Sequence, residues 1–523
     1  MTNTIKYIVV LAMGTSLFVA CEPEFDKELR EREPVSSGAA DFSNYVALGN
    51  SLTAGLADNS LYIDGQLAAY PNILAEQMKL AGGGEFKIPL ATSNAGGLTV
   101  GGAEIRNACS GMNRFPKRSV LAIVDGERGV QPYSLAGAPT EATTVLSGPF
   151  NNMGVPGAKS FHLLAPGYGK FNPYFGRFAS GPEASVVQDV IAQKPTFFTL
   201  WIGNNDTLDY ATSGGATTTD DAACGGDLTD PIMFQQAVGG TVQTLLKNTS
   251  AKGVLVNLPS VTSIPFFTTV PFAPLDPRSE TFGPQIPTLN ATFTGLNQAF
   301  AAIGVPERSI NFSTTGPSAV VIKDESLEDV SVKLTEVLQL GGFDIGTATV
   351  YGLQYGKARQ ATPNDLLVLT SSAVIGRPNA ERFAELSTLG VPAESAGQLS
   401  VNGVTFPLED KWVLTPSEQK EIADAQAAFN AVIVGLVEAN PERLALFDAK
   451  AQLEEVASTG VTVDGDVITA EFATGGGFSL DGVHLTPRGN ALIANGLIDV
   501  INNTFGANLT KVEPGTYKTV TIE

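Results

Sequence analysis

Four short apolar runs along the chain have the pattern of buried β-strands. They span residues 45–49, 195–202, 253–258 and 443–449. Each run is too short for a buried helix and is bounded by polar or turn-forming residues. Segments with helical spacing of their apolar residues precede the last three runs, at 183–194, 231–248 and 416–442. Strand and helix therefore alternate, which predicts an α/β fold with a parallel sheet covered on both faces.

Two regions depart from this alternation. Residues 82–150 are rich in Gly and Pro, and we expect a fifth strand before Asn152 at a position that the pattern leaves open. From Pro259 to about Thr415 the alternation is lost in a stretch rich in Pro and Phe. We interpret residues 266–415 as an insertion between core segments 41–265 and 416–510, with a C-terminal tail at 511–523. The insertion leaves the sheet at the carboxyl end of a strand, the edge where open α/β sheets bind ligands.

The first forty residues have the pattern of an export signal and a tether. Lys6 precedes an apolar run that ends at Ala20 and is too short to span a bilayer, which predicts a signal peptide at 1–20. "LFVAC" resembles the lipobox of bacterial lipoproteins, with Phe18 in place of the usual Leu, so we expect lipid attachment at Cys21. An ordinary secretory signal is the alternative. Residues 21–40 are charged and then rich in Ser and Gly, as in a solvated tether. We therefore expect an outer-membrane lipoprotein held to the membrane by its lipid.

Composition narrows the possible partners and cofactors. The net charge of −21 argues against nucleic acid, since phosphate binding needs clustered Lys and Arg. Cys109 and Cys224 remain after Cys21 is assigned to lipid, and export to an oxidising compartment predicts a disulfide between them; two free thiols are the alternative. With two His and no Cys-x-x-Cys in the chain, we expect no zinc site and no cofactor. Calcium binding by carboxylates alone stays open.

Ser51 lies in "GNSLTAG", between the first predicted strand and a segment compatible with a helix. It could cap that helix or act as a nucleophile. Three further stretches bear on the choice. They are "NNMGVPG", ending at Gly157; "WIGNND", with Asn205; and "DGVH", from Asp481 to His484.

These four stretches, in this order, resemble the sequence blocks of the SGNH hydrolases, also called GDSL lipases and esterases. The resemblance implies a three-layer α/β/α, flavodoxin-like fold and a serine ester hydrolase. Asn50 stands where the family name has Asp, which bears on local hydrogen bonding because that residue is not the nucleophile. The Gly-x-Ser-x-Gly elbow of the α/β-hydrolases is absent from the sequence.

The resemblance also implies a role for each site residue. Ser51 is the nucleophile, His484 the general base and Asp481 the carboxylate that orients the imidazole, although Asp481 could instead only cap its turn. The oxyanion donors are the N–H groups of Ser51 and Gly157 and the side-chain amide of Asn205. Gly154 is the competing candidate for the second donor, and we expect Asp206 to hydrogen-bond its loop.

The predicted function is hydrolysis of acyl esters carried by lipids or glycans. The alternative is a surface protein that binds a ligand on an inactive hydrolase scaffold. Phe266, Phe267 and Phe272 could line an acyl pocket or form a lid, but we favour their burial against the core of the insertion. His162 lies among apolar residues, where a packed or rim histidine is expected; its nearness to Gly157 leaves contact with the substrate as the alternative.

Overall fold

A computed structural model describes residues 35–106, 113–124, 127–134, 137–219 and 226–523. A parallel five-stranded sheet lies at its centre, in the order β13-β8-β7-β1-β6. The strands are β1 (Tyr45–Gly49), β6 (Asn152–Gly154), β7 (Phe197–Trp201), β8 (Lys252–Val256) and β13 (Leu444–Phe447). The predicted α/β class is therefore confirmed, and each of the four apolar runs overlaps one strand, β8 starting one residue before its run.

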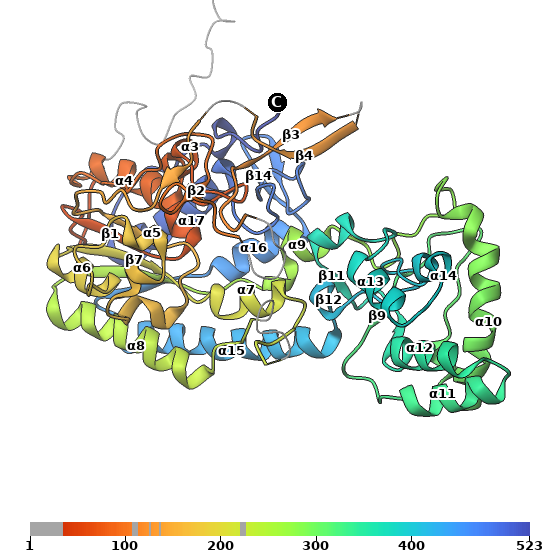
Figure 1. Cartoon of the computed structure of the whole chain (residues 1–523). Helices are drawn as coiled ribbons and strands as arrows, with labels where there is room; N and C mark the ends of the chain where they lie inside the picture. The colour runs from red at the N-terminus through yellow and green to blue at the C-terminus, as the bar shows by residue number, and fades with distance from the viewer. Residues whose placement is uncertain (1–34, 107–112, 125–126, 135–136, 220–225) are drawn as a thin grey trace, which may run out of the picture.

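Helices pack on both faces of the sheet (Figure 1). α17 (Pro487–Phe505) contacts α4 (Tyr70–Leu80) and α16 (Ala449–Ser458), whereas α15 (Pro416–Glu438) contacts α8 (Pro231–Asn248); both α17 and α15 contact β8 and β13. The predicted helix at 231–248 coincides with α8, and the others are shorter than their patterns. These helices are α4 (Tyr70–Leu80), α6 (Val186–Ala192), α8 (Pro231–Asn248), α15 (Pro416–Glu438), α16 (Ala449–Ser458) and α17 (Pro487–Phe505).

The fifth strand lies at Asn152–Gly154, so the expectation that it would precede Asn152 is wrong. Hydrophobic patterning misses β6 because only Met153 among its residues is apolar, and because it is a three-residue edge strand paired with β1 alone. Its place beside β1 sets Gly154 next to Gly49, two residues before Ser51. Strand β6 is therefore formed by residues of the second motif, "NNMGVPG".

Residues 82–150 form short elements outside the central sheet. A β-hairpin is made of β3 (Ser119–Val124) and β4 (Glu127–Pro132), and it extends from the body of the molecule in Figure 1. The chain end joins it through a bridge between Leu121 and Ile522. The remaining short elements of the sheet-containing part are α2 (Ser51–Ala54), α3 (Ile63–Leu67), β2 (Leu98–Thr99), β5 (Thr140–Glu141), α5 (Pro173–Gly176), α7 (Asn205–Thr212), β14 (Val461–Val463) and β15 (Asp466–Ile468).

A second hydrophobic core lies between residues 270 and 413, separate from the core around the sheet. It lies beside the sheet-containing part, at the right of Figure 1. Trp412 packs against both cores, and a bridge joins Val270 to Leu367 near the junction. Its elements are α10 (Ile286–Ala302), β9 (Val321–Lys323), α11 (Ser331–Leu340), α12 (Ile345–Tyr355), β10 (Ala358–Gln360), β11 (Leu366–Leu367), α13 (Ala380–Thr388), α14 (Ala393–Gln398) and β12 (Val413–Leu414), and α9 (Pro265–Thr268) leads into them.

Several predictions fall outside the part of the chain that the structure describes. These are the signal peptide, lipid attachment at Cys21, most of the tether, and the disulfide between Cys109 and Cys224. Within the described ranges, no helix combines the length and apolar composition that crossing a bilayer requires.

Candidate active site

Ser51 is the first residue of α2, directly beyond the carboxyl end of β1. The helix is capped by Asn50, whose side-chain oxygen accepts the Leu52 N–H at 3.0 Å. The capping interpretation of Ser51 is therefore wrong, and its hydroxyl is free for another partner. The Asn50 amide also donates to the Asn204 side-chain oxygen at 2.9 Å, which joins the first motif to the third.

The turn at Asp481–His484 is built around the Asp481 carboxylate. One carboxylate oxygen accepts the N–H groups of Val483 and His484 at 2.9 and 2.8 Å. The other lies 2.9 Å from His484 Nδ1. Gly482 has φ +72°, a left-handed conformation that favours glycine. Asp481 thus caps its turn and contacts the imidazole, so the two roles weighed for it coexist.

The hydroxyl, the imidazole and the carboxylate form one continuous row. His484 Nε2 lies 2.8 Å from Ser51 Oγ, and the opposite ring nitrogen faces Asp481. The His484 side chain is 14% exposed and that of Asp481 is 6% exposed. This is the geometry in which a base takes a hydroxyl proton while a carboxylate fixes its tautomer.

The local environment keeps Asp481 ionised. Burial by itself raises the pKa of the Asp481 carboxyl, but the charge of His484 and hydrogen bonds from His484 and the Asn59 N–H hold this pKa well below its usual range. The carboxylate is therefore available to stabilise a protonated imidazole.

Two candidate oxyanion donors lie beyond the carboxyl ends of β6 and β7, the strands on either side of β1. Asn205 begins α7, just after β7, and its amide nitrogen donates to the Ala158 carbonyl at 2.9 Å, which leaves one amide hydrogen over. Gly157 precedes Ala158, has φ +76° and is exposed. Because β6, β1 and β7 are adjacent and parallel, the three motifs meet at one edge of the sheet.

Gly154 has a different role from Gly157. Its N–H already donates to the Asn152 side-chain oxygen at 2.9 Å. A Cβ at Gly154 would lie 2.3 Å from the Ala54 nitrogen, so this glycine allows β6 to approach α2 closely. The structure therefore favours Gly157 over Gly154 as a donor.

Asp206 and His162 support the loops around these donors. Asp206 accepts the N–H and the hydroxyl of Ser160 at 2.8 and 2.6 Å, as expected for a residue that braces its loop. His162 stacks on Tyr168, with ring centroids 4.5 Å apart, and accepts the Lys159 N–H. Burial, together with the nearby charge of Lys159, lowers the pKa of His162 to about 4. His162 is thus the packed histidine that was predicted.

Sequence reasoning missed two residues that hold Asp481. The Asn59 N–H donates to Asp481 Oδ2 at 3.0 Å, and the Asp58 carboxylate accepts the neighbouring Leu480 N–H at 3.0 Å. Both residues have left-handed backbones, with φ +52° at Asp58 and +69° at Asn59. Asp and Asn tolerate this conformation better than most residues. The adjacent Asp58 and Asn59 were therefore the feature of the sequence from which a left-handed turn at this place could have been predicted.

A small cavity opens beside Ser51 and His484. Its volume is about 40 Å³, and apolar side chains that include Leu52, Leu208 and Ile264 form much of its wall. By this measure a single water needs roughly 10–15 Å³, so the space equals about three waters. It is much smaller than the pockets of roughly 300–1,000 Å³ that hold drug-sized ligands.

The three phenylalanines at the start of the insertion do not line this cavity. Phe267 is buried in the core around the sheet, and Phe266 packs against the same core. Only Phe272 packs against the core of the insertion. The favoured interpretation of these residues is therefore wrong for Phe266 and Phe267, because α9 still belongs to the sheet-containing part.

Within the described ranges, one group of carboxylates has the composition of a metal site. Oxygens of Glu325, Asp410 and Glu418 lie within 4.8 Å of one another, at the junction of the insertion with α15. None of the three lines the cavity beside Ser51. This group is separate from the Ser51–His484–Asp481 row.

Comparison of the chain with protein-family models, curated proteins and solved structures finds no match.

Proposed function

We propose that this protein is a serine ester hydrolase of the SGNH type. The observation that carries the proposal is the row from Ser51 Oγ through the His484 ring to the Asp481 carboxylate, with contacts of 2.8 and 2.9 Å. A serine hydroxyl is a weak nucleophile unless a base takes its proton, and this row supplies the base and its orienting carboxylate.

The proposed reaction proceeds through an acyl-enzyme. Ser51 Oγ attacks the ester carbonyl carbon as its proton passes to His484 Nε2. His484 then returns that proton to the alkoxide as the carbon–oxygen bond of the leaving alcohol breaks. Water repeats the sequence, with His484 as base, and releases the carboxylic acid and free Ser51.

Charge on the carbonyl oxygen needs donors already aimed at it. The N–H of Ser51, as the first residue of α2, has no acceptor within the helix. The N–H of Gly157 and the second amide hydrogen of Asn205 complete the proposed set. Loss of one such donor typically lowers kcat by ~10²–10³.

The cavity of about 40 Å³ supports a short acyl group, such as acetyl, as the substrate class. It has room for two or three carbons beside Ser51, and its wall is largely apolar. We therefore propose that the protein removes short acyl groups from an alcohol that lies outside this cavity.

The function is tested with variants at three residues. Ser51→Ala should lower hydrolysis of p-nitrophenyl acetate by ~10³-fold or more, and a fluorophosphonate should label Ser51 in the wild type. His484→Ala should lower kcat by a similar factor and remove the neutral-side limb of the pH–rate profile. His162→Ala is the matched control and should keep that limb. Full activity in Ser51→Ala would contradict the proposal, and absence of turnover in the wild type would support the binding-protein alternative.

Acyl-chain preference is measured on the wild type with p-nitrophenyl acetate, butyrate and octanoate. We expect kcat/KM for the acetate to exceed that for the octanoate by ~10-fold or more, because one methylene in a pocket changes discrimination by roughly 1–3 kcal/mol. A preference for octanoate would contradict the short-acyl assignment and leave the role of Ser51 intact.

A further inference from the structure

The insertion contains a cavity of about 1520 Å³ that is separate from the cavity beside Ser51. It is bounded by α10, α12, the segment between α13 and α14, and the loop before α10. Ligand pockets typically measure roughly 300–1,000 Å³, so this volume suits an extended molecule.

Apolar side chains on two sides of this cavity are exposed to solvent. Ile345 and Leu353 of α12 are each 73% exposed, and Leu389 after α13 is 64% exposed. Ile345 and Leu353 are eight residues apart, so they lie on one face of α12. Deeper in the cavity, Leu275 and Val404 are buried in the core of the insertion. Exposed apolar residues gathered in one concavity, rather than scattered singly, mark a binding site for an apolar body.

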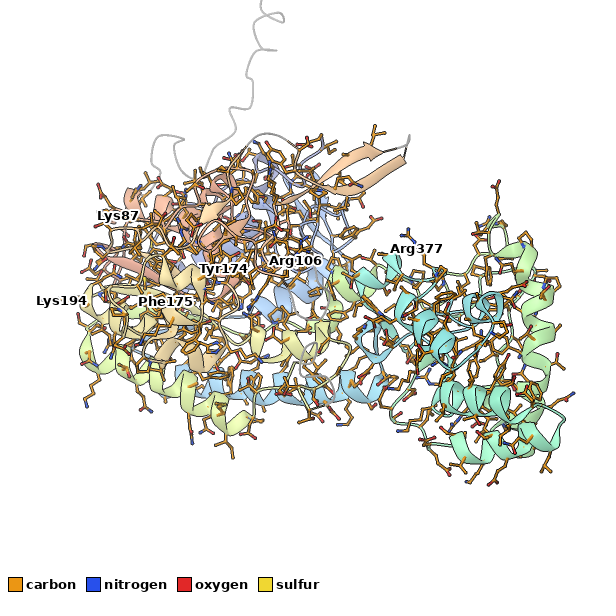
Figure 2. All side chains as sticks on the ribbon, viewed as in Figure 1. Lys87, Arg106, Tyr174, Phe175, Lys194 and Arg377 are labelled. Atoms are coloured by element: carbon orange, nitrogen blue, oxygen red, sulfur yellow. The ribbon has the colours of Figure 1, made fainter. Side chains whose placement is uncertain are left out.

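The charged residues that line the cavity indicate which polar group a bound apolar molecule would carry. Asp276 is paired with Arg278 at 2.7 Å, and Asp344 caps α12 by accepting the Thr347 N–H. The backbone of Arg377 is hydrogen-bonded to Val374 and Asn402, but its guanidinium has no hydrogen-bond or ion-pair partner among the described residues. Its side chain stands clear of the ribbon at the upper edge of the insertion (Figure 2). Arg377 is therefore the one cation among the described residues of the lining, and it is not paired with either Asp276 or Asp344.

We propose that this cavity binds an amphiphile with a long aliphatic chain and one anionic headgroup. The chain lies against Ile345, Leu353 and Leu389, and the headgroup pairs with the Arg377 guanidinium. A guanidinium matches either a carboxylate or a phosphate, so the shared chemistry is an anionic group on an aliphatic chain. The proposal does not depend on ester hydrolysis at Ser51.

Binding is measured on the full chain with Ser51→Ala, so that hydrolysis cannot change the ligand. The probe is cis-parinaric acid, a fluorescent fatty acid. Leu353→Gln with Leu389→Gln should weaken its binding by at least ~10-fold, since both changes remove apolar contact area. The matched control is Val332→Gln with Leu340→Gln on α11, which are 72% and 88% exposed and lie outside the cavity. Equal affinities in the two double variants would overturn the proposal.

The headgroup is tested with Arg377→Gln. This change should weaken binding of cis-parinaric acid by about 3- to 5-fold, the effect of an exposed charge pair, and leave binding of its methyl ester unchanged. An equal effect on acid and ester, or none on either, would overturn the assignment of Arg377. Competition by palmitate and by lysophosphatidylglycerol then separates a free fatty acid from a phospholipid, and failure of both to compete would overturn the ligand class.

Discussion

Asp58 connects the loop that follows Ser51 to the turn that carries Asp481. Its N–H donates to the Ser479 hydroxyl and its carboxylate accepts the Leu480 N–H, both at 3.0 Å. The Tyr62 hydroxyl donates to the same carboxylate. Burial raises the pKa of Asp58 to about 6; the hydrogen bond from Leu480 opposes this shift and the charge of Asp481 adds to it. Asp58 is therefore a positioning residue that fixes the backbone next to Asp481.

We expect Asp58→Ala to lower kcat by ~10-fold with KM nearly unchanged. Alanine leaves the buried Leu480 N–H without an acceptor, which costs roughly 1–3 kcal/mol, and it tolerates the left-handed backbone poorly. Asp58→Asn keeps an acceptor and the backbone preference, so it should restore kcat to within a few-fold of the wild type. Steady-state kinetics with p-nitrophenyl acetate separate the two parameters. Equal losses in both variants, or a change in KM alone, would contradict this role.

The residues of the candidate active site could be proposed from the sequence because each lies in a short motif. Ser51, Asn205 and His484 were identified from their neighbours in the sequence, and the structure brings Ser51 and His484 to 2.8 Å. Asp58 could not be predicted in this way. Its partner Ser479 lies 421 positions away, and no local spacing reports a hydrogen bond over that separation.

Helix α15 begins at a junction of three carboxyl groups. Glu418, in its first turn, accepts the Thr415 N–H and hydroxyl, and it lies close to Asp410 and Glu325 from the insertion. Burial, followed by the charges of Glu325 and Glu418, raises the pKa of Asp410. Burial also raises the pKa of Glu418 to about 7, although the hydrogen bonds from Thr415 oppose this shift. The folded state therefore keeps protons here that the unfolded chain releases near pH 4.

Stability should consequently fall as pH rises from about 4 to about 8. The folded protein binds more protons than the unfolded chain in this window, so each rise in pH favours unfolding. Asp410→Asn removes one of the carboxyl groups whose pKa is raised. It should increase Tm at pH 8 by about 1–3 °C, with a smaller effect at pH 5. Asp424→Asn, at an exposed ion pair on the same helix, is the control. Thermal unfolding followed by circular dichroism gives Tm, and a larger gain at pH 5 would contradict the expectation.

Elements with continuous apolar runs could be predicted from the sequence, and those without could not. β7 and α8 follow directly from patterning. Two of the three residues of β6 are polar or small. Its strand conformation depends on pairing with β1, a tertiary contact between segments that are far apart in the sequence. The loss of strand–helix alternation after Pro259 agrees with the second core at residues 270–413. The contact of α9 with the turn at Asp481–His484 could not be predicted: the Phe266 N–H donates to the Gly482 carbonyl at 2.9 Å.

At the scale of the whole molecule, the expected lipid on Cys21 would decide where the proposed hydrolase acts. Cys21→Ser should abolish metabolic labelling with palmitate and move the protein from the membrane fraction to the soluble fraction, because no other lipid anchor is predicted. Fractionation followed by immunoblotting measures the shift, with the Ser51→Ala variant as a control that keeps its anchor. A Cys21→Ser protein that stays with the membrane would contradict the lipobox assignment.

The pairing of β8 with β13 has a consequence for how the chain reaches its fold. Residues 257–443 separate the two strands, and they include the insertion with its own core. Contacts across such a long separation form late, because the entropy of closing the loop opposes them. Until β13 arrives, β8 has one open edge with unpaired backbone groups, in a strand that is almost wholly apolar. Self-association of partly folded chains would therefore begin at β8, while the insertion has already closed around its own core.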